Sequence, residues 1–158
     1  MMNKYDDAVN IMMERYNKDE IWSVATANGK KQDVRFVGGF YEDGAVYTVT
    51  YTLSNKMKQI EANPEVAVCS FWFTGHGIGE NLGWVRDEKN AETMKRVRVA
   101  FAEWYDNGHT DEDDPNTCLL RIRLTDGVII DHEKKYGAFR YEVDFVNKSA
   151  RSMASSFM

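Results

Sequence analysis

Hydrophobic positions along the chain follow two different periods, which predict helices in three places and strands between them. In residues 3–17, apolar side chains from Val9 to Tyr16 recur at the three- and four-residue spacing of an amphipathic helix, with acids in the first turn. The same spacing recurs in residues 54–62 and 91–105. These three segments are the predicted helices.

Between the predicted helices, short runs rich in β-branched and aromatic residues alternate with turn signals such as Asn28-Gly29 and Asp126-Gly127. The expected strands are 21–27, 33–41, 45–52, 65–73, a short segment near Trp84, 117–125, 127–131 and 138–146. Strands joined mostly by tight turns predict a mainly β fold, a small antiparallel β-barrel with helices packed outside it.

Glycines add further expectations. Gly38-Gly39 lies inside a predicted strand, which indicates a bulge or a close approach of two backbones. Residues 74–83, TGHGIGENLG, are predicted to form a loop that is mobile until a ligand binds. The spacing of these glycines does not match a dinucleotide-binding motif. The tail, residues 147–158, is small and polar and is expected to be frayed.

Composition indicates an ordinary globular protein with a generous supply of aromatic residues. Of 158 residues, 43% are hydrophobic and 13% aromatic, so a single domain over 1–158 is expected to bury a substantial core. The net charge of −5 argues against nucleic-acid binding, which needs a basic surface. The first residues contain no apolar signal segment, and no run approaches a membrane span, so we expect a cytoplasmic protein without a membrane partner.

Several residues with reactive or ligand-binding side chains do not form a recognisable motif. Cys69 and Cys118 lie in apolar runs without metal spacing, which favours reduced, buried cysteines, with a disulfide as the alternative. The three histidines share no ligand spacing, and the acidic run 111–114 lacks the calcium-loop pattern and is expected to be a solvated loop. Trp72 and Trp84 are expected in the core or an interface, with contact to a planar ligand as the alternative.

The start of the predicted helix 54–62 is the strongest candidate site. Ser54 is a good N-cap, but Met57 occupies the position where a capping box needs Glu or Gln, so first-turn amides stay free. A lysine there, Lys56, opposes the helix dipole by about 0.3–1 kcal/mol, and a bound phosphate would reverse that effect. The alternative is a solvated lysine on an ordinary capped helix. Arg35, in an otherwise apolar strand, either needs an anion or faces outward.

The ordered combination of these features resembles a known superfamily. Residues 21–73 contain an ATxxG first strand, R-x-V on the second, a third strand ending in Thr, then S-x-K, a short helix and NPxVA. This order is similar to that of the pyridoxamine 5′-phosphate oxidase-like FMN-binding split-barrel superfamily. The resemblance implies a split barrel, FMN as cofactor, and a homodimer with the flavin at its interface.

The resemblance also implies a set of cofactor-binding residues. Residues on the second and third strands would contact the flavin ring, and the S-x-K segment would hold the phosphate. The residues in these positions are Arg35, Phe36, Val37, Val49, Thr50, Ser54, Asn55 and Lys56. No protein acid or base is implied, because hydride transfer to a flavin does not need one.

The chain departs from genuine pyridoxamine phosphate oxidases at three points. Asn55 stands where they carry Arg, Phe40 stands where they carry Lys, and their C-terminal Arg-x-His segment has no counterpart. These differences favour the branch of flavin reductases, stress-related proteins and nitroimidazole-resistance-like proteins. We therefore expect an FMN-dependent oxidoreductase acting on a small molecule, with NADH or NADPH as a candidate substrate. The alternatives are a non-catalytic carrier of flavin or haem, and a deazaflavin coenzyme in place of FMN.

Overall fold

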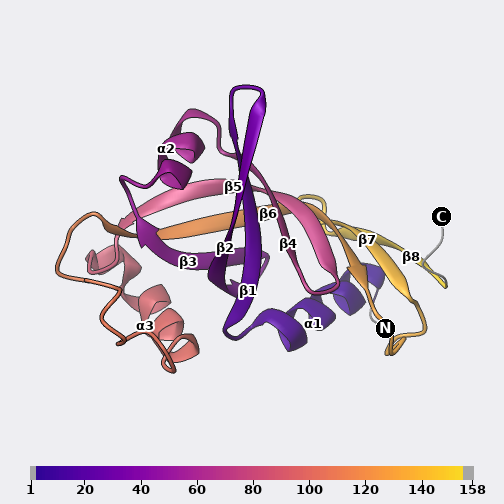
Figure 1. Cartoon of the computed structure of the whole chain (residues 1–158). Helices are drawn as coiled ribbons and strands as arrows, with labels where there is room; N and C mark the ends of the chain where they lie inside the picture. The colour runs from indigo at the N-terminus through magenta and orange to yellow at the C-terminus, as the bar shows by residue number, and fades with distance from the viewer. Residues whose placement is uncertain (1–2, 155–158) are drawn as a thin grey trace.

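An antiparallel barrel closed by six strands forms the body of the molecule, and its sheet continues into two further strands (Figure 1). The computed structural model describes residues 3–154. The strand order is β3-β2-β1-β4-β5-β6-β7-β8, and pairing between β3 and β6 closes the barrel. The strands are β1 (Glu20–Asn28), β2 (Lys31–Glu42), β3 (Ala45–Tyr51), β4 (Glu65–Ser70), β5 (Phe73–Trp84), β6 (Thr117–Ile130), β7 (Arg140–Asp144) and β8 (Ser149–Met153). The expected mainly β fold with a small antiparallel barrel is confirmed.

Three α-helices pack outside the barrel (Figure 1). They are α1 (Lys4–Tyr16), α2 (Asn55–Ala62) and α3 (Ala91–Ala100), the last preceded by a short 3₁₀ turn, Glu88–Asn90. The N-cap of α1 closes a capping box, because the Asn3 side chain accepts from the Asp6 N–H and the Asp6 carboxylate accepts from the Asn3 N–H. Helix α3 is shorter than predicted because residues 101–106 form turns. Within residues 3–154, no helix is both long and apolar enough to span a bilayer.

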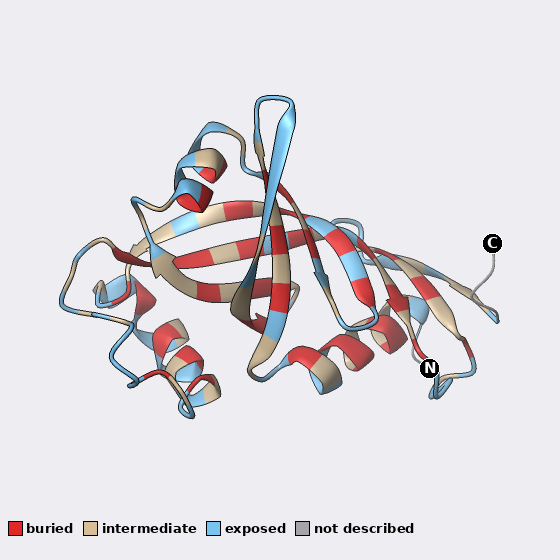
Figure 2. Cartoon of the chain, in the orientation of Figure 1, coloured by how far each residue is buried: buried red, intermediate tan, exposed pale blue. Residues whose placement is uncertain are grey.

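Buried and exposed residues alternate along most strands, as expected when one face packs and the other meets solvent (Figure 2). The main core lies inside the barrel and under α1, where Trp22 and Ile122 are fully buried. A second cluster joins α3 to the outer face of the barrel through Phe101, Leu119 and Phe40. The helices therefore cover separate faces of the sheet.

The predicted mobile loop over 74–83 is wrong, because these residues belong to strand β5. Gly75, Gly77 and Gly79 recur with a period of two and are all buried. A Cβ atom at Gly75 would lie 2.4 Å from the carbonyl oxygen of Asp126, and those at Gly77 and Gly79 would lie 2.7 and 3.0 Å from isoleucine side chains. The glycines therefore permit close packing of strands and do not mark a flexible segment.

Other boundaries also differ from the prediction. Asp126-Gly127 is not a turn but part of the single long strand β6, which pairs with β5 through an irregular register. The tail is not frayed where it is described, because β8 pairs with β7; residues 155–158 lie outside the described part. Gly38-Gly39 forms no bulge, because β1 pairs through this point in regular register. A Cβ at Gly39 would lie 2.4 Å from the Trp22 side chain, so this glycine makes room for the indole and not for a second backbone.

Candidate functional site

The barrel has a gap between β2 and β3. These strands pair only near their hairpin, from Phe40↔Tyr47 to Glu42↔Ala45. Farther along, residues 31–39 of β2 pair with β1, and residues 48–51 of β3 pair with β6. Each strand therefore presents one unpaired edge toward the gap, with backbone N–H and C=O groups free to bind a ligand.

The structure brings the predicted cofactor residues to this gap. Three lie on β2 and two on β3, in the stretches whose gap-facing edges are unpaired, and three lie at the start of α2, which follows β3. In that order they are Arg35, Phe36 and Val37; Val49 and Thr50; and Ser54, Asn55 and Lys56.

Lys56 is buried, with only 9% of its surface exposed. Its ammonium Nζ donates to Thr50 Oγ1 at 2.6 Å, so two predicted site residues are in direct contact. Burial lowers the pKa of Lys56, and the nearby positive charge of Arg35 lowers it further. The solvated surface lysine, which the sequence left open, is therefore excluded.

Arg35 is half-buried and turned toward the barrel, so it is not an outward-facing surface arginine. Its Nη1 atom donates to Thr26 Oγ1 at 2.7 Å and to the carbonyl oxygens of Val24 and Asp33 at 3.3 Å. Within residues 3–154, neither Arg35 nor Lys56 forms an ion pair with a carboxylate. Two positive charges thus share this site with only neutral oxygen partners.

The first turn of α2 adds further hydrogen-bond donors. Ser54 caps the helix, and its Oγ accepts from the Met57 N–H at 3.3 Å. No acidic residue lies in the first turn, so the cap is open on the side predicted from the sequence. The N–H groups of Asn55 and Lys56 have no acceptor inside the helix because the turn begins there. Free amides, the helix dipole and a buried lysine together make an anion-binding site.

Sequence reasoning missed two residues that hold this site in place. Gln59 on α2 donates to the Asp33 carboxylate at 2.7 Å and contacts the hydroxyl of Thr26, which in turn accepts from Arg35. These bonds fix α2 against the β1–β2 hairpin. Gln59 belongs to no motif, and Thr26 lies in the Ala-Thr segment of the first strand but was given no role there. Only the register of β1 with β2, in which Val24 lies opposite Arg35, brings Thr26 near the guanidinium.

An apolar face adjoins the gap on the outside of β2, β1 and β4. Phe36 is 78% exposed, whereas Val37 packs against the core, as expected for neighbours on a strand. A groove of about 520 Å³ lies on this face, and no charged side chain lines it. Its lining is Ile21, Ser23, Phe36, Val37, Gly38, Cys69, Ser70 and Phe71. The expectation that both cysteines are buried is therefore wrong for Cys69, which is exposed here; Cys118 is buried, and both are free thiols.

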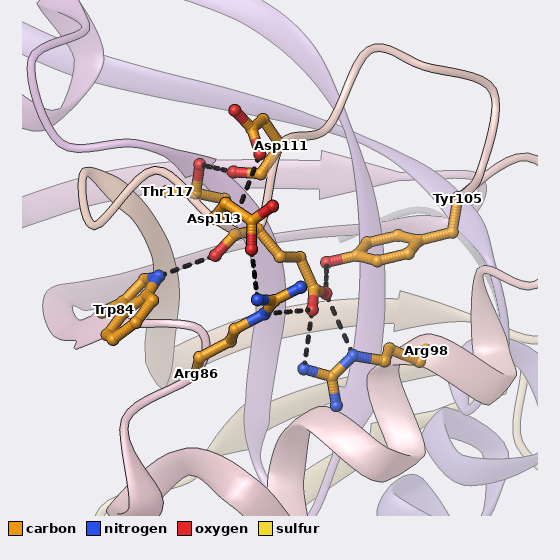
Figure 3. A network of polar contacts seen from close by, with 8 residues as sticks. Trp84, Arg86, Arg98, Tyr105, Asp111, Asp113 and Thr117 are labelled. Carbon is orange, nitrogen blue, oxygen red and sulfur yellow. Dashed lines mark hydrogen bonds and ion pairs between the residues drawn. The ribbon is translucent and has the colours of Figure 1, made fainter.

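A second group of cations lies near α3 (Figure 3). Unlike Arg35 and Lys56, these cations are paired with a carboxylate, that of Glu112. Glu112 accepts from Nε and Nη2 of Arg98 at 3.0 Å each and from the Tyr105 hydroxyl at 2.5 Å, and lies 3.6 Å from Nε of Arg86. Burial raises the pKa of Glu112, but hydrogen bonds from Arg98 and Tyr105 outweigh burial and leave it below its usual value. Trp84 donates to the Glu112 carbonyl oxygen at 2.8 Å. The acidic run 111–114 is thus anchored at Glu112 and is not simply a solvated loop.

The histidines lie on other elements. His76 on β5 contacts the Asp126 carboxylate at 2.8 Å, and His132 packs edge-on against Trp72. In the part of the chain that the structure describes, no three His, Cys, Asp or Glu side chains gather as metal ligands would. The chemistry that the donors at the gap support is therefore the binding of an anion.

No protein-family model matches the chain. It is similar to general stress protein 26 of Bacillus subtilis (strain 168), with 28% identity over 112 residues that cover 68% of this chain and 76% of that protein. Solved structures with the same fold include a NimC/NimA family protein from Clostridium acetobutylicum, with a TM-score of 0.54 and 17% identity over 92% of this chain and 94% of the other.

Two further solved structures with this fold are of proteins described as binding a cofactor. A FAD-binding protein from Mesorhizobium loti has a TM-score of 0.54 and 16% identity over 70% of this chain and 85% of the other. A haem-binding protein from Mycobacterium smegmatis has a TM-score of 0.64 and 10% identity over 94% of this chain and 60% of the other. At these identities the likeness establishes the fold, and a fold alone does not establish a function.

Proposed function

We propose that this chain, which has the split-barrel fold of the pyridoxamine 5′-phosphate oxidase-like superfamily, is a homodimeric FMN-binding oxidoreductase. One observation carries the proposal. Arg35 and Lys56 share a gap in the barrel and form no ion pair within residues 3–154, so we expect them to bind an anion from outside the chain. FMN combines a phosphate with a planar ring.

The start of α2 fits the phosphate. Lys56 donates one of its three ammonium protons to Thr50, so two remain to donate to phosphate oxygens. The Ser54 oxygen accepts from Met57, which leaves its hydroxyl proton free to donate. The amides of Asn55 and Lys56 complete a set of donors at the positive end of the helix dipole.

The unpaired edges of β2 and β3 fit the ring. Their backbone N–H and C=O groups match the polar rim of an isoalloxazine, and Val37 and Val49 offer apolar contact beside it. All three hydrogen bonds of Arg35 use Nη1, so Nε and Nη2 can face the ligand. When bound, FMN would supply the electron or hydride transfer, and these residues would bind it, orient it and exclude water.

The apolar face supports the homodimer. Ile21, Val34, Phe36 and Phe71 are each more than half exposed, and patches of this kind mark interaction sites. The face is continuous with the gap through Phe36 and Val37, so a second copy seated there would cover the open side of the flavin. Phe36→Glu should convert a dimer into monomers in light scattering and weaken FMN binding. A wild-type monomer at micromolar concentration that binds FMN tightly would contradict this arrangement.

A second candidate is a haem carrier, favoured by the fold shared with the mycobacterial haem-binding protein over 94% of this chain. The three histidines lie on β5, the loop after α3 and the loop after β6, and not on the elements that form the gap. This placement favours flavin, because haem iron needs an axial ligand such as His. A deazaflavin coenzyme would use the same phosphate donors as FMN.

The absorbance spectrum of the freshly purified protein tests these possibilities together. Flavin bands support the proposal, a Soret band supports the haem carrier, and a deazaflavin spectrum replaces FMN by that coenzyme. Oxidation of NADH or NADPH by the FMN-loaded protein would then establish turnover. Tight FMN binding without any turnover would make the protein a flavin carrier. A cytoplasmic location remains a prediction from the sequence.

A further inference from the structure

A separate cavity is lined by residues from the C-terminal half of α1, the turn between β4 and β5, and the loop after β6. Its volume is about 360 Å³, and none of the eight predicted cofactor residues lines it. We propose that this cavity binds a small planar aromatic carboxylate. The inference does not depend on the proposed flavin site, because different side chains carry it.

The first observation is the backbone of Trp72. Strand β4 ends at Ser70 and β5 begins at Phe73, so Phe71 and Trp72 are the central residues of a two-residue turn. Trp72 has φ +66°, in the left-handed region where such a turn favours glycine. Its side chain is nevertheless 56% exposed. A large aromatic residue held in a strained conformation without being buried points to a functional role.

The Trp72 indole forms an aromatic wall of the cavity. It meets the His132 ring edge-on, with ring centroids 4.2 Å apart and an angle of 80° between the planes. His132 in turn packs edge-on against Phe139, with centroids 5.1 Å apart. This chain of rings holds the indole in place and leaves the rest of its surface available to a planar ligand.

The second observation is Arg15, which also lines the cavity. Its Nη2 atom lies 3.6 Å from the Asp131 carboxylate, which is longer than a hydrogen bond. Asp131 already accepts from the backbone N–H groups of Glu133 at 3.2 Å and Lys135 at 2.9 Å. The Nη1 atom of Arg15 is buried and has no acceptor within residues 3–154. A ligand carboxylate would supply that acceptor in a charge-assisted hydrogen bond.

The remaining charges around the cavity balance one another. Lys135 is paired with Glu14 at 2.5 Å, so these two charges compensate each other. Lys18 and Glu133 also line the cavity, carry opposite charges and form no ion pair in the described part of the chain. The choice of an anion therefore rests on the Arg15 guanidinium, whose ion pair with Asp131 at 3.6 Å leaves Nη1 without an acceptor. The volume is at the small end for ligand pockets, which fits a single ring and its carboxylate.

Calorimetric titration of the full-length protein with benzoate tests the site, and benzamide supplies the same ring without the charge. We expect benzoate to bind at least ten times more tightly than benzamide. Arg15→Gln should weaken benzoate roughly ten- to a hundredfold and leave benzamide unchanged, and Arg15→Lys should give an intermediate loss. Trp72→Gly should weaken both compounds while keeping or raising thermal stability, because it removes the ring and relieves the backbone.

Arg123→Gln, at an exposed arginine on the outer face of β6, is the matched control and should change neither affinity. Circular dichroism identifies any variant that fails to fold, and Arg15→Lys keeps the test valid if Arg15→Gln does. Absence of benzoate binding, or benzoate affinity unchanged in both Arg15→Gln and Trp72→Gly, overturns the proposal. Repeating the titration with and without FMN separates this result from the fate of the flavin proposal.

Discussion

Two cationic clusters in this small barrel differ in how their charge is compensated. Near α3, Arg86 and Arg98 surround the Glu112 carboxylate, which receives hydrogen bonds from both nitrogens of one guanidinium edge (Figure 3). In the gap between β2 and β3, Arg35 and Lys56 contact only neutral oxygen atoms. The charges of one cluster are therefore compensated within the chain, whereas those of the other have no carboxylate partner within residues 3–154.

The pKa values record this difference. The carboxylate of Glu112 raises the pKa of Arg98, as expected for a cation with a partner. Burial, assisted by Arg35, lowers the pKa of Lys56, as expected for a cation without one. An enclosed charge without an internal partner lowers the stability of the free protein and gives binding energy to an anionic ligand. Perturbed groups of this kind gather at functional sites.

The largest expected loss of stability comes from removing the carboxylate of the cluster near α3. Glu112→Gln removes the carboxylate that joins Arg86, Arg98 and Tyr105, and we expect a loss of roughly 2–3 kcal/mol in the free energy of unfolding. The arginines are partly exposed, which keeps the loss below that of a fully buried pair. Chemical denaturation measures it. Glu103→Gln, at an exposed acid without an ion pair in residues 3–154, is the control. FMN affinity should stay unchanged, and a large loss would show that the two clusters are coupled.

A smaller change in stability should follow when a carboxylate is added to the cluster of Arg35 and Lys56, which we call the open cluster. Asn55→Asp adds a negative charge at the first residue of α2 with almost no change in shape. The free protein should gain about 0.3–1 kcal/mol from the helix dipole. FMN affinity should fall about tenfold because the new charge repels the phosphate. Asn63→Asp, at the other end of α2, is the matched control and should leave FMN affinity nearly unchanged. Tighter FMN binding in Asn55→Asp would contradict the assignment.

The smallest effect is on pH dependence. Since the pKa of Lys56 is below 10.5 in the folded protein, the unfolded chain holds more protons in the window just below 10.5. Stability of the free protein should therefore rise with pH through that window, because the penalty for the buried charge is lost. FMN affinity should fall over the same range, by less than tenfold, as Lys56 loses its proton. Lys56→Met should flatten both curves, and curves identical to wild type would assign the titration to another group.

Local signals predicted the parts of the site that are contiguous in sequence. Ser54 before a helical pattern, with no acid at the third position, was sufficient to predict an open cap, because capping depends on four consecutive residues. The partners of Arg35 could not be predicted, because Thr26 reaches it only through the register of β1 with β2. Gln59 is one polar helix residue among several until the hairpin lies beside it.

Strand β5 shows where composition misled the prediction. Glycine favours loops through backbone freedom, but here the absence of a side chain lets β5 approach β6 and α2. The period-two spacing of Gly75, Gly77 and Gly79 was the available signal. Cys69 was misplaced for a related reason. An apolar run on a strand predicts burial on at least one face, but not that the second face also remains apolar and exposed.

The most direct test of the open cluster compares two ligands that differ only in the phosphate. Lys56→Met should weaken FMN roughly ten- to a hundredfold, which corresponds to the 1.5–3 kcal/mol of a charge-assisted contact, and should leave riboflavin almost unchanged. Fluorescence titration of both ligands against wild type and variant gives the four affinities, and denaturation should show a free protein at least as stable as wild type. Equal losses of affinity for FMN and riboflavin, or no loss for either, would contradict the claim that Lys56 binds the phosphate of FMN.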